Sequence, residues 1–132
     1  MLFRSLLAEC VTLGGCNTGE AKITGGYDLP SKHVIHTVGP VWDGGRANED
    51  ALLADCYRNS LKLGEGNGLR MVAFPAISTG VFGFPNERAT RIAVRGVRAF
   101  LDQDVGVEQV IFVCFSERDF GIYQRVPHMA SN

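Results

Sequence analysis

The sequence predicts an α/β domain, and three features indicate it. Short apolar runs rich in β-branched and aromatic residues alternate with longer segments of helical periodicity. The 16 glycines gather at the junctions between these segments, where tight turns and close backbone approaches favour glycine. With 132 residues, the chain has room for one domain around one core. We therefore expect a single domain over 1–132.

Three apolar runs are predicted to be strands. They cover residues 34–38, 71–77 and 110–115. Short continuous apolar runs of this kind suit strands that are buried on both faces, as in a parallel sheet.

Three segments are predicted to be helices. The first covers 48–63, with acidic residues in its first turn and Gly64 as its stop. A third helix starts at Ser116, with Asp119 in an approximate capping-box position. Its residues Phe120 and Tyr123 are expected to pack inward.

The second helix starts at about Asn86. It has an apolar stripe at Ala89, Ile92, Ala93, Val97, Phe100 and Leu101. Its arginines, at 88, 91, 95 and 98, follow another face, which we interpret as solvent-exposed rather than as a basic groove.

Composition narrows the function classes. Apolar residues make up 45% of the chain and charged residues 20%, which is a globular rather than a disordered balance. The net charge of −1 lacks the basic excess of a dedicated nucleic-acid binder. No apolar run approaches the roughly 20 residues of a membrane span, and the N-terminus does not resemble a signal peptide. We therefore expect a cytoplasmic protein with no nucleic-acid or membrane partner.

The cysteines and histidines do not predict a metal site. The four cysteines lack short paired spacing, and the three histidines do not cluster with them. We expect no metal and no cofactor, with Cys56 on a helix face and Cys114 in a strand.

The stretch FPAISTGVFGFP, residues 74–85, is the main candidate site. A strand, a glycine-containing loop and a helix in this order can cradle an anion on backbone N–H groups and the helix N-terminus. Ser78 and Thr79 add small hydroxyls, and Gly80 is expected to take positive φ and let a phosphate approach. From the spacing alone, a phosphate loop and a structural turn both remain open. The lysine of a P-loop is missing.

Aromatic residues flank this loop. Phe82 and Phe84 either pack on a flat or sugar-like part of a ligand or fold back onto the core. Phe115 ends the last apolar run, so it shares a crevice with the loop if the two strands are neighbours. There it could stack on a base, or it could be a core residue.

Three stretches in order resemble the macrodomain family: TGEAKITGGYDLP (18–30), VIHTVGPVW (34–42) and FPAISTGVFGFP (74–85). The likeness runs over about 6–126 and is strongest to the branch that acts on O-acetyl-ADP-ribose and on mono-ADP-ribosylated proteins. The resemblance implies a three-layer α/β/α sandwich around a mixed sheet, with a crevice for ADP-ribose. It implies that Ser78, Thr79, Gly80, Val81 and Phe82 wrap the diphosphate, that Phe82 lies against the distal ribose, and that Phe115 packs by the adenosine.

The sequence also departs from the family. The strand ending in N-A-A-N, the glycine-rich loop and the V-D-G segment do not occur in it, so the expected fold is N-terminally truncated. The asparagine and aspartate assigned to catalysis in the family lie in that part, which leaves the catalytic residues unknown. Candidate bases are His36, Asp43 and Asp28, none singled out by spacing. We interpret His36 as a satisfied polar residue beside the sheet and Asp28 as part of the turn before Pro30.

The resemblance places the absent strand between those matching 34–38 and 71–77. Its loss would leave two exposed strand edges. We expect the gap to be closed by strand re-pairing, by self-association (most simply a homodimer) or by an outside segment; with none of these the chain would be unstable alone.

Three functions remain open. The first is hydrolysis of an ester or glycosidic link at the distal ribose of ADP-ribose, with O-acetyl-ADP-ribose or mono-ADP-ribosylated proteins as substrates. The second is a module that binds ADP-ribose or a related nucleotide without turning it over, and the third is an inactive remnant. The absent motifs weigh against the first.

Overall fold

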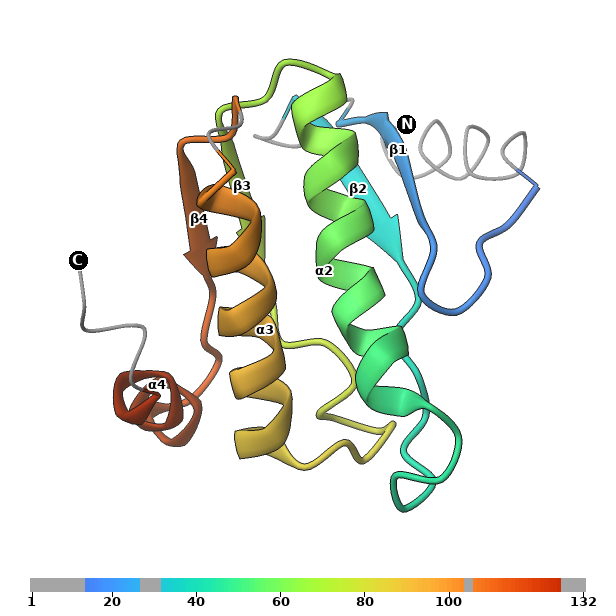
Figure 1. Ribbon diagram of the computed structural model, residues 1–132, viewed down its shortest axis with the longest axis vertical. Helices are drawn as coiled ribbons and strands as arrows, with labels where there is room; N and C mark the ends of the chain where they lie inside the picture. The colour runs from blue at the N-terminus through green and yellow to red at the C-terminus, as the bar shows by residue number, and fades with distance from the viewer. Residues whose placement is uncertain (1–13, 27–31, 104–105, 127–132) are drawn as a thin grey trace.

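The computed structural model describes residues 14–26, 32–103 and 106–126. Over these residues the chain alternates strands and helices (Figure 1), which confirms the α/β class. The elements are β1 (Ala21–Gly25), β2 (His33–Thr37), α2 (Glu49–Gly66), β3 (Met71–Phe74), α3 (Asn86–Leu101), β4 (Gln109–Phe112) and α4 (Glu117–Arg125).

The strands form two separate pairs. β1 and β2 are antiparallel, with Ile23 opposite Ile35, and β3 and β4 are parallel, with Val72 opposite Val110. Within the described residues, β2 and β3 are not hydrogen-bonded to each other. The expected closure by strand re-pairing is therefore wrong for this part of the chain. Both pairs contact α2, which holds each in place; self-association and an outside segment stay predictions.

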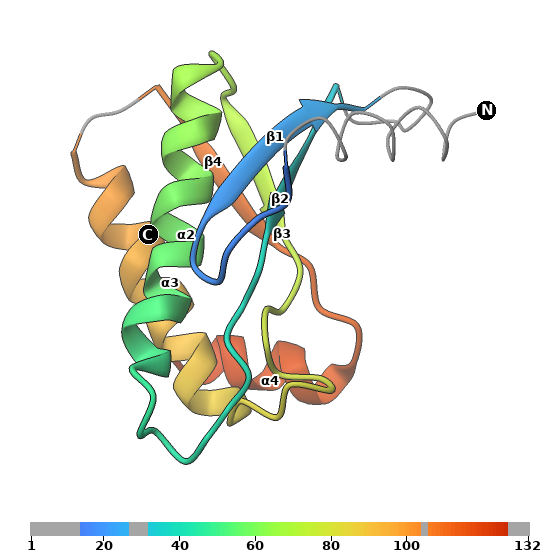
Figure 2. The ribbon, with the colours of Figure 1, turned by 90° about the vertical axis from the view of Figure 1, so that its right-hand side faces the viewer.

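The two long helices lie side by side over one side of the strands (Figures 1 and 2). The apolar stripe predicted for α3 packs against α2 and belongs to the same core cluster as Val72 and Phe74 of β3, because its small residues allow the two helices to approach closely. Tyr57 of α2 packs against Phe74 of β3 with ring centroids 4.9 Å apart. One core cluster consists of Leu53, Tyr57, Leu61, Val72, Phe74, Phe84, Ala89, Ala93, Val97, Phe100 and Val107. A second contains Val94, Tyr123 and Val126.

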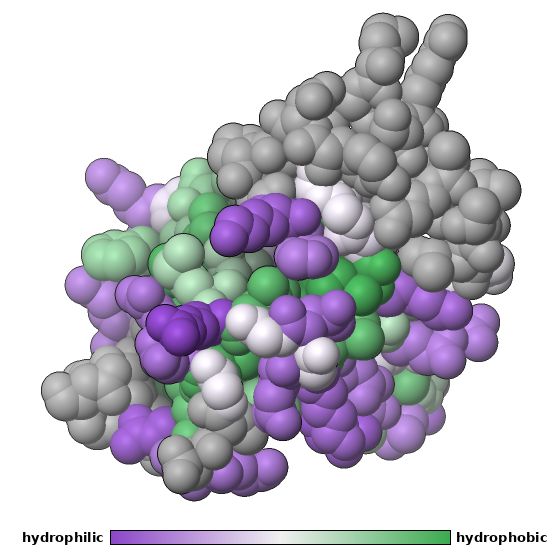
Figure 3. All heavy atoms as spheres, turned by 90° about the horizontal axis from the view of Figure 1, so that it is seen from above, coloured by the Kyte–Doolittle hydropathy of each residue, from purple (hydrophilic) through white to green (hydrophobic). Residues whose placement is uncertain are grey.

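The other face of the β3–β4 pair is exposed. Met71, Ala73, Ile111 and Val113 alternate with buried or half-buried neighbours and face away from the helices. Burial on both faces was expected, but a second helical layer over this pair is not among the described residues. Seen from above, hydrophobic surface is open between more hydrophilic side chains (Figure 3).

The helix ends follow the sequence closely. The Ser116 hydroxyl accepts a 3.1 Å hydrogen bond from the backbone N–H of Asp119, so the predicted cap of α4 is confirmed. Tyr123 is buried as expected, whereas Phe120 is 55% exposed, because no element covers that side of α4 within the described residues. α2 runs past Gly64, the expected stop, since Gly64 lies within the helix and faces Val72 of β3.

Three of the four α3 arginines form exposed ion pairs, as a solvated face would. Arg88 pairs with Asp50 of α2. The other two pair within or just beyond α3, Arg91 with Glu87 and Arg98 with Asp102.

β1 was not predicted, and Cys114 follows β4 instead of lying in it. No helix in the described part of the chain is long and apolar enough to cross a bilayer.

Candidate functional site

The loop between β3 and α3 carries the predicted phosphate contacts. Its two ends are tied by hydrogen bonds from the Phe84 N–H to the Ser78 carbonyl (2.9 Å) and from the Gly83 N–H to the Gly80 carbonyl (3.0 Å). Positive φ occurs at Ser78 (66°) and Gly83 (74°), and Gly80 does not share it. The expectation for Gly80 is wrong because the turn closes at Gly83, which takes the left-handed conformation in its place.

Five consecutive backbone N–H groups of this loop are free to bind an anion. Within the described residues, those of Ser78, Thr79, Gly80, Val81 and Phe82 donate no hydrogen bond. α3 begins shortly afterwards, and its N-cap, Pro85, offers no side-chain acceptor to the first turn. Open N–H groups next to a helix N-terminus attract negative charge through both hydrogen bonding and the helix dipole. The left-handed Ser78 is a strained position of the kind that gathers at functional sites.

Trp42, from the segment after β2, fixes the far end of the loop. Its backbone N–H donates to the Phe82 carbonyl at 2.9 Å, and its ring packs on Phe84 with centroids 4.7 Å apart. Arg88 lies over the Trp42 ring at 5.2 Å and makes a bidentate ion pair with Asp50. Trp42 thus connects the N-termini of α2 and α3 with the segment between β2 and α2 and with the loop between β3 and α3.

Gly39 brings the two loops into direct contact. A Cβ atom there would lie 2.1 Å from the Ser78 Oγ and 2.6 Å from the Ile77 Cγ2. The Ser78 hydroxyl is buried and has no hydrogen-bond partner within the described residues. Only a glycine at this position allows the segment after β2 to lie against the loop between β3 and α3.

Glu49 organises the segment that leads into α2. Its carboxylate is 1% exposed and accepts hydrogen bonds from the backbone N–H groups of Asp43 (2.7 Å), Gly45 (3.0 Å) and Ala47 (2.6 Å). Burial alone would raise the pKa of Glu49, but these N–H groups outweigh it and leave the pKa below its usual value. An ionised Glu49 therefore anchors the loop that carries Trp42.

The aromatic residues divide between core and surface. Phe84 is 1% exposed and belongs to the core, whereas Phe82 is 40% exposed and Val81 fully exposed. Phe115 is 77% exposed, so it is not a core residue. β3 and β4 are neighbours, as the shared crevice requires. The roles of Phe82 and Phe115 toward a ligand stay predictions.

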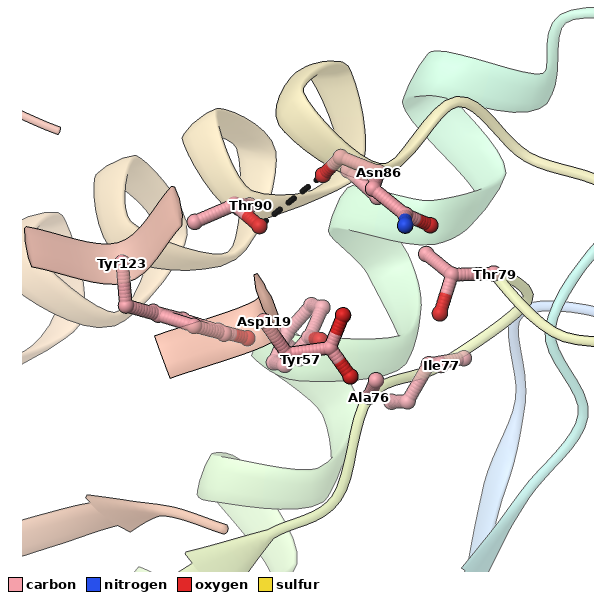
Figure 4. A pocket seen from close by; sticks show the side chains of 9 residues that line it. Tyr57, Ala76, Ile77, Thr79, Asn86, Thr90, Asp119 and Tyr123 are labelled. Carbon is pink, nitrogen blue, oxygen red and sulfur yellow. Dashed lines mark hydrogen bonds between the residues drawn. The ribbon is translucent and has the colours of Figure 1, made fainter. Parts of the chain in front are cut away.

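A small pocket lies behind the loop, between the start of α3 and α4 (Figure 4). It is lined by Tyr57, Ala76, Ile77, Thr79, Asn86, Ala89, Thr90, Asp119 and Tyr123. Burial raises the pKa of Tyr57 well above its usual value and that of Tyr123 to about 12, so both phenols are protonated at neutral pH. Sequence reasoning assigned Asp119 only to the cap of α4 and missed this pocket, because helix periodicity does not show which distant segment faces a side chain.

Neither of the two candidate bases within the described residues is placed as a general base. His36 Nε2 lies 2.9 Å from the Thr24 hydroxyl between β2 and β1, in agreement with a satisfied polar residue. Asp43 is exposed and lies 3.6 Å from Arg46. Asp28 lies outside the described residues.

Cys16, Cys56 and Cys114 are free thiols whose pKa values are raised, chiefly by burial, which makes them poor nucleophiles at neutral pH. The described residues contain no group of three His, Cys, Asp or Glu side chains suited to a metal ion.

Comparisons with known proteins identify the family of the chain. The Macro domain family model matches residues 4–93. The chain is 58% identical over 120 residues to the Macro domain-containing protein CT2219 of Chlorobaculum tepidum, covering 91% of this chain and 70% of that protein. It is 54% identical over 124 residues to the ADP-ribose glycohydrolase MACROD2 of Homo sapiens, covering 91% of this chain but only 29% of that protein.

Solved structures show the same fold. The Oceanobacillus iheyensis macrodomain with ADP superposes with a TM-score of 0.83 at 43% identity, over 92% of this chain and 65% of that one. The Trypanosoma brucei macrodomain in complex with ADP gives a TM-score of 0.85 at 42% identity, over 92% of this chain and 51% of that one. The predicted resemblance is confirmed, and the chain belongs to the macrodomain family.

Proposed function

We propose that this chain binds ADP-ribose, with the diphosphate on the loop 78–82 and the adenosine against Phe115. The observation that carries the proposal is the row of five open backbone N–H groups beside the N-terminus of α3. A diphosphate needs several donors at close range, and backbone groups held by a closed loop supply them without reorganisation. The exposed ring of Phe115 gives a flat surface for the base.

The relatives support the ligand class. Macrodomains from Oceanobacillus iheyensis and Trypanosoma brucei are described with ADP, and a single-residue variant of the former with ADPR. These relatives share at least 42% of their residues with this chain over the aligned part.

We further propose that the site serves hydrolysis at the distal ribose, with O-acetyl-ADP-ribose or mono-ADP-ribosylated proteins as substrates. MACROD2, at 54% identity, is named an ADP-ribose glycohydrolase. The phosphate loop would contribute by holding the substrate so that a water molecule can reach the reacting carbon, which is a positioning effect.

The second candidate is a module that binds ADP-ribose without turning it over. The surroundings of two candidate bases favour this function, because they do not place either residue for catalysis. His36 is engaged with Thr24, and Asp43 is an exposed surface residue. Binding needs only the loop and Phe115. A turnover assay with O-acetyl-ADP-ribose separates the two candidates.

Thermal unfolding with and without ADP-ribose tests the binding proposal. We expect a cooperative transition that moves up by several degrees at a ligand concentration of about 100 times the dissociation constant, because that excess stabilises the folded state by about 2.7 kcal/mol. Ribose 5-phosphate at equal concentration should give a smaller shift, since it lacks the base. A transition that ignores ADP-ribose at millimolar concentration would contradict the proposal.

Phe115→Ala tests the adenosine contact. Removing a stacked ring should weaken the binding of ADP-ribose by about 1–3 kcal/mol, which lowers its affinity roughly 5- to 150-fold. The affinity for ribose 5-phosphate should stay nearly unchanged. Titration calorimetry with both ligands measures the difference. Equal losses for the two ligands would indicate a packing defect and would place the base elsewhere.

A further inference from the structure

The carboxylate of Asp119 is the charged group of the pocket behind the phosphate loop. It points into the pocket from the first turn of α4 (Figure 4). Its backbone N–H caps the helix through Ser116, but within the described residues its carboxylate takes part in no hydrogen bond or ion pair. The side chain is only half-buried, so a ligand can reach it.

The other polar groups of the pocket do not neutralise this charge. No Lys, Arg or His is among the described residues that line it. The Thr90 hydroxyl donates to the Asn86 carbonyl at 2.9 Å, and the hydroxyls of Tyr57 and Tyr123 stay protonated. The pocket therefore offers a hydrogen-bond acceptor to hydroxyl groups and an uncompensated negative charge to phosphates.

The pocket shares a residue with one part of the proposed ligand site and a neighbouring chain segment with the other. Thr79 belongs both to the pocket lining and to the phosphate loop. Phe115, the proposed adenosine contact, directly precedes Ser116, the N-cap of the helix that carries Asp119. In a nucleoside diphosphate, the group that joins the phosphates to the base is a ribose.

We propose that Asp119 is a specificity-determining residue that accepts hydrogen bonds from the hydroxyls of the ribose next to the base. It selects nucleoside diphosphates with a free 2′-hydroxyl and rejects those with a 2′-phosphate. The inference rests on the proposed binding of ADP-ribose. Its physical basis is general: an acidic side chain suits a ribose diol, whereas a 2′-phosphate calls for a basic one, and like charges at close range repel.

The test is titration calorimetry of the full chain with ADP-ribose and with its analogue phosphorylated at the 2′-position of the adenosine. The wild type should bind ADP-ribose at least about tenfold more tightly than the analogue. In Asp119→Asn, the affinity for ADP-ribose should fall about tenfold, while that for the analogue should rise because the repulsion is gone. The ratio of the two affinities should approach one.

Asp102→Asn is the matched control. It removes the same charge from the C-cap of α3, where the Asp102 side chain is 70% exposed and roughly 24 Å along the helix from Asn86. Both affinities should equal those of the wild type. A change like that of Asp119→Asn would mean that overall charge, rather than the pocket, sets the preference.

The outcomes separate this proposal from the binding proposal. Equal losses for both ligands in Asp119→Asn would show that the Asp119 side chain supports the site without distinguishing the two riboses, and would overturn the proposal. A wild type without preference would overturn the selectivity even if the variant failed to fold. In either case ADP-ribose binding would stand. A wild-type protein that binds neither ligand would overturn both the proposed binding of ADP-ribose and the proposed role of Asp119.

Discussion

Replacing Gly80 with valine is expected to remove most of the affinity for ADP-ribose without unfolding the protein. The backbone at Gly80 does not have positive φ, and a Cβ atom there would meet no other atom within 4 Å. The loop can therefore keep its shape while the branched side chain blocks the approach of the diphosphate. Losing two hydrogen bonds to a charged group, at about 1.5–3 kcal/mol each, corresponds to a loss of at least roughly 100-fold in affinity. Calorimetric titration with ADP-ribose measures it.

Gly66→Val is the control for this change. Gly66 also lacks positive φ and has open space at its Cβ position, but it lies at the end of α2. It should bind ADP-ribose as the wild type does. Unchanged affinity in Gly80→Val, with the same unfolding temperature, would show that the ligand binds away from this loop.

Gly39→Ala is expected to have the larger effect on stability. The new methyl group would overlap the Ser78 Oγ at 2.1 Å and the Ile77 Cγ2 at 2.6 Å. The serine hydroxyl can rotate, but moving the Ile77 Cγ2 requires rotation about χ1, which is restricted in a β-branched side chain. Overpacking of this kind costs about 1–3 kcal/mol, which lowers the unfolding temperature by several degrees in a domain of this size. Thermal unfolding followed by circular dichroism measures the change.

Gly66→Ala provides the comparison for added volume alone. It places a methyl group in open space on a helix, where alanine is favoured over glycine, so its unfolding temperature should equal or exceed that of the wild type. If Gly39→Ala unfolded at the wild-type temperature, the contact between the two loops would not contribute to stability.

The helices could be predicted from the sequence because their signals are local. The stripe of α3 and its start at Asn86 depend on residues within a few turns of each other. The cap of α4 lies within four residues, from Ser116 to Asp119. The position of the loop between β3 and α3 was equally predictable, since strand, glycine-containing loop and helix follow one another directly.

The pairing of the strands could not be predicted in this way. Pairing depends on which segments meet across the fold, and α2 contacts β1, β2 and β3 together. For the same reason β3 and β4 expose Met71 and Ile111, although their sequences read as buried on both faces.

The sequence by itself determined the family, the helices and the position of the glycine-containing loop between β3 and α3. Only the tertiary structure decided how that segment is used. Phe84 is buried and Phe82 is not, because Trp42 reaches the loop from about 40 positions earlier in the chain. Positive φ lies at Ser78 and Gly83, because the loop is closed by hydrogen bonds between its two ends. Asp119 enters the pocket because α4 packs against α3. Local conformation is encoded in neighbouring residues, whereas burial and charge environment depend on distant segments that meet only when the chain folds.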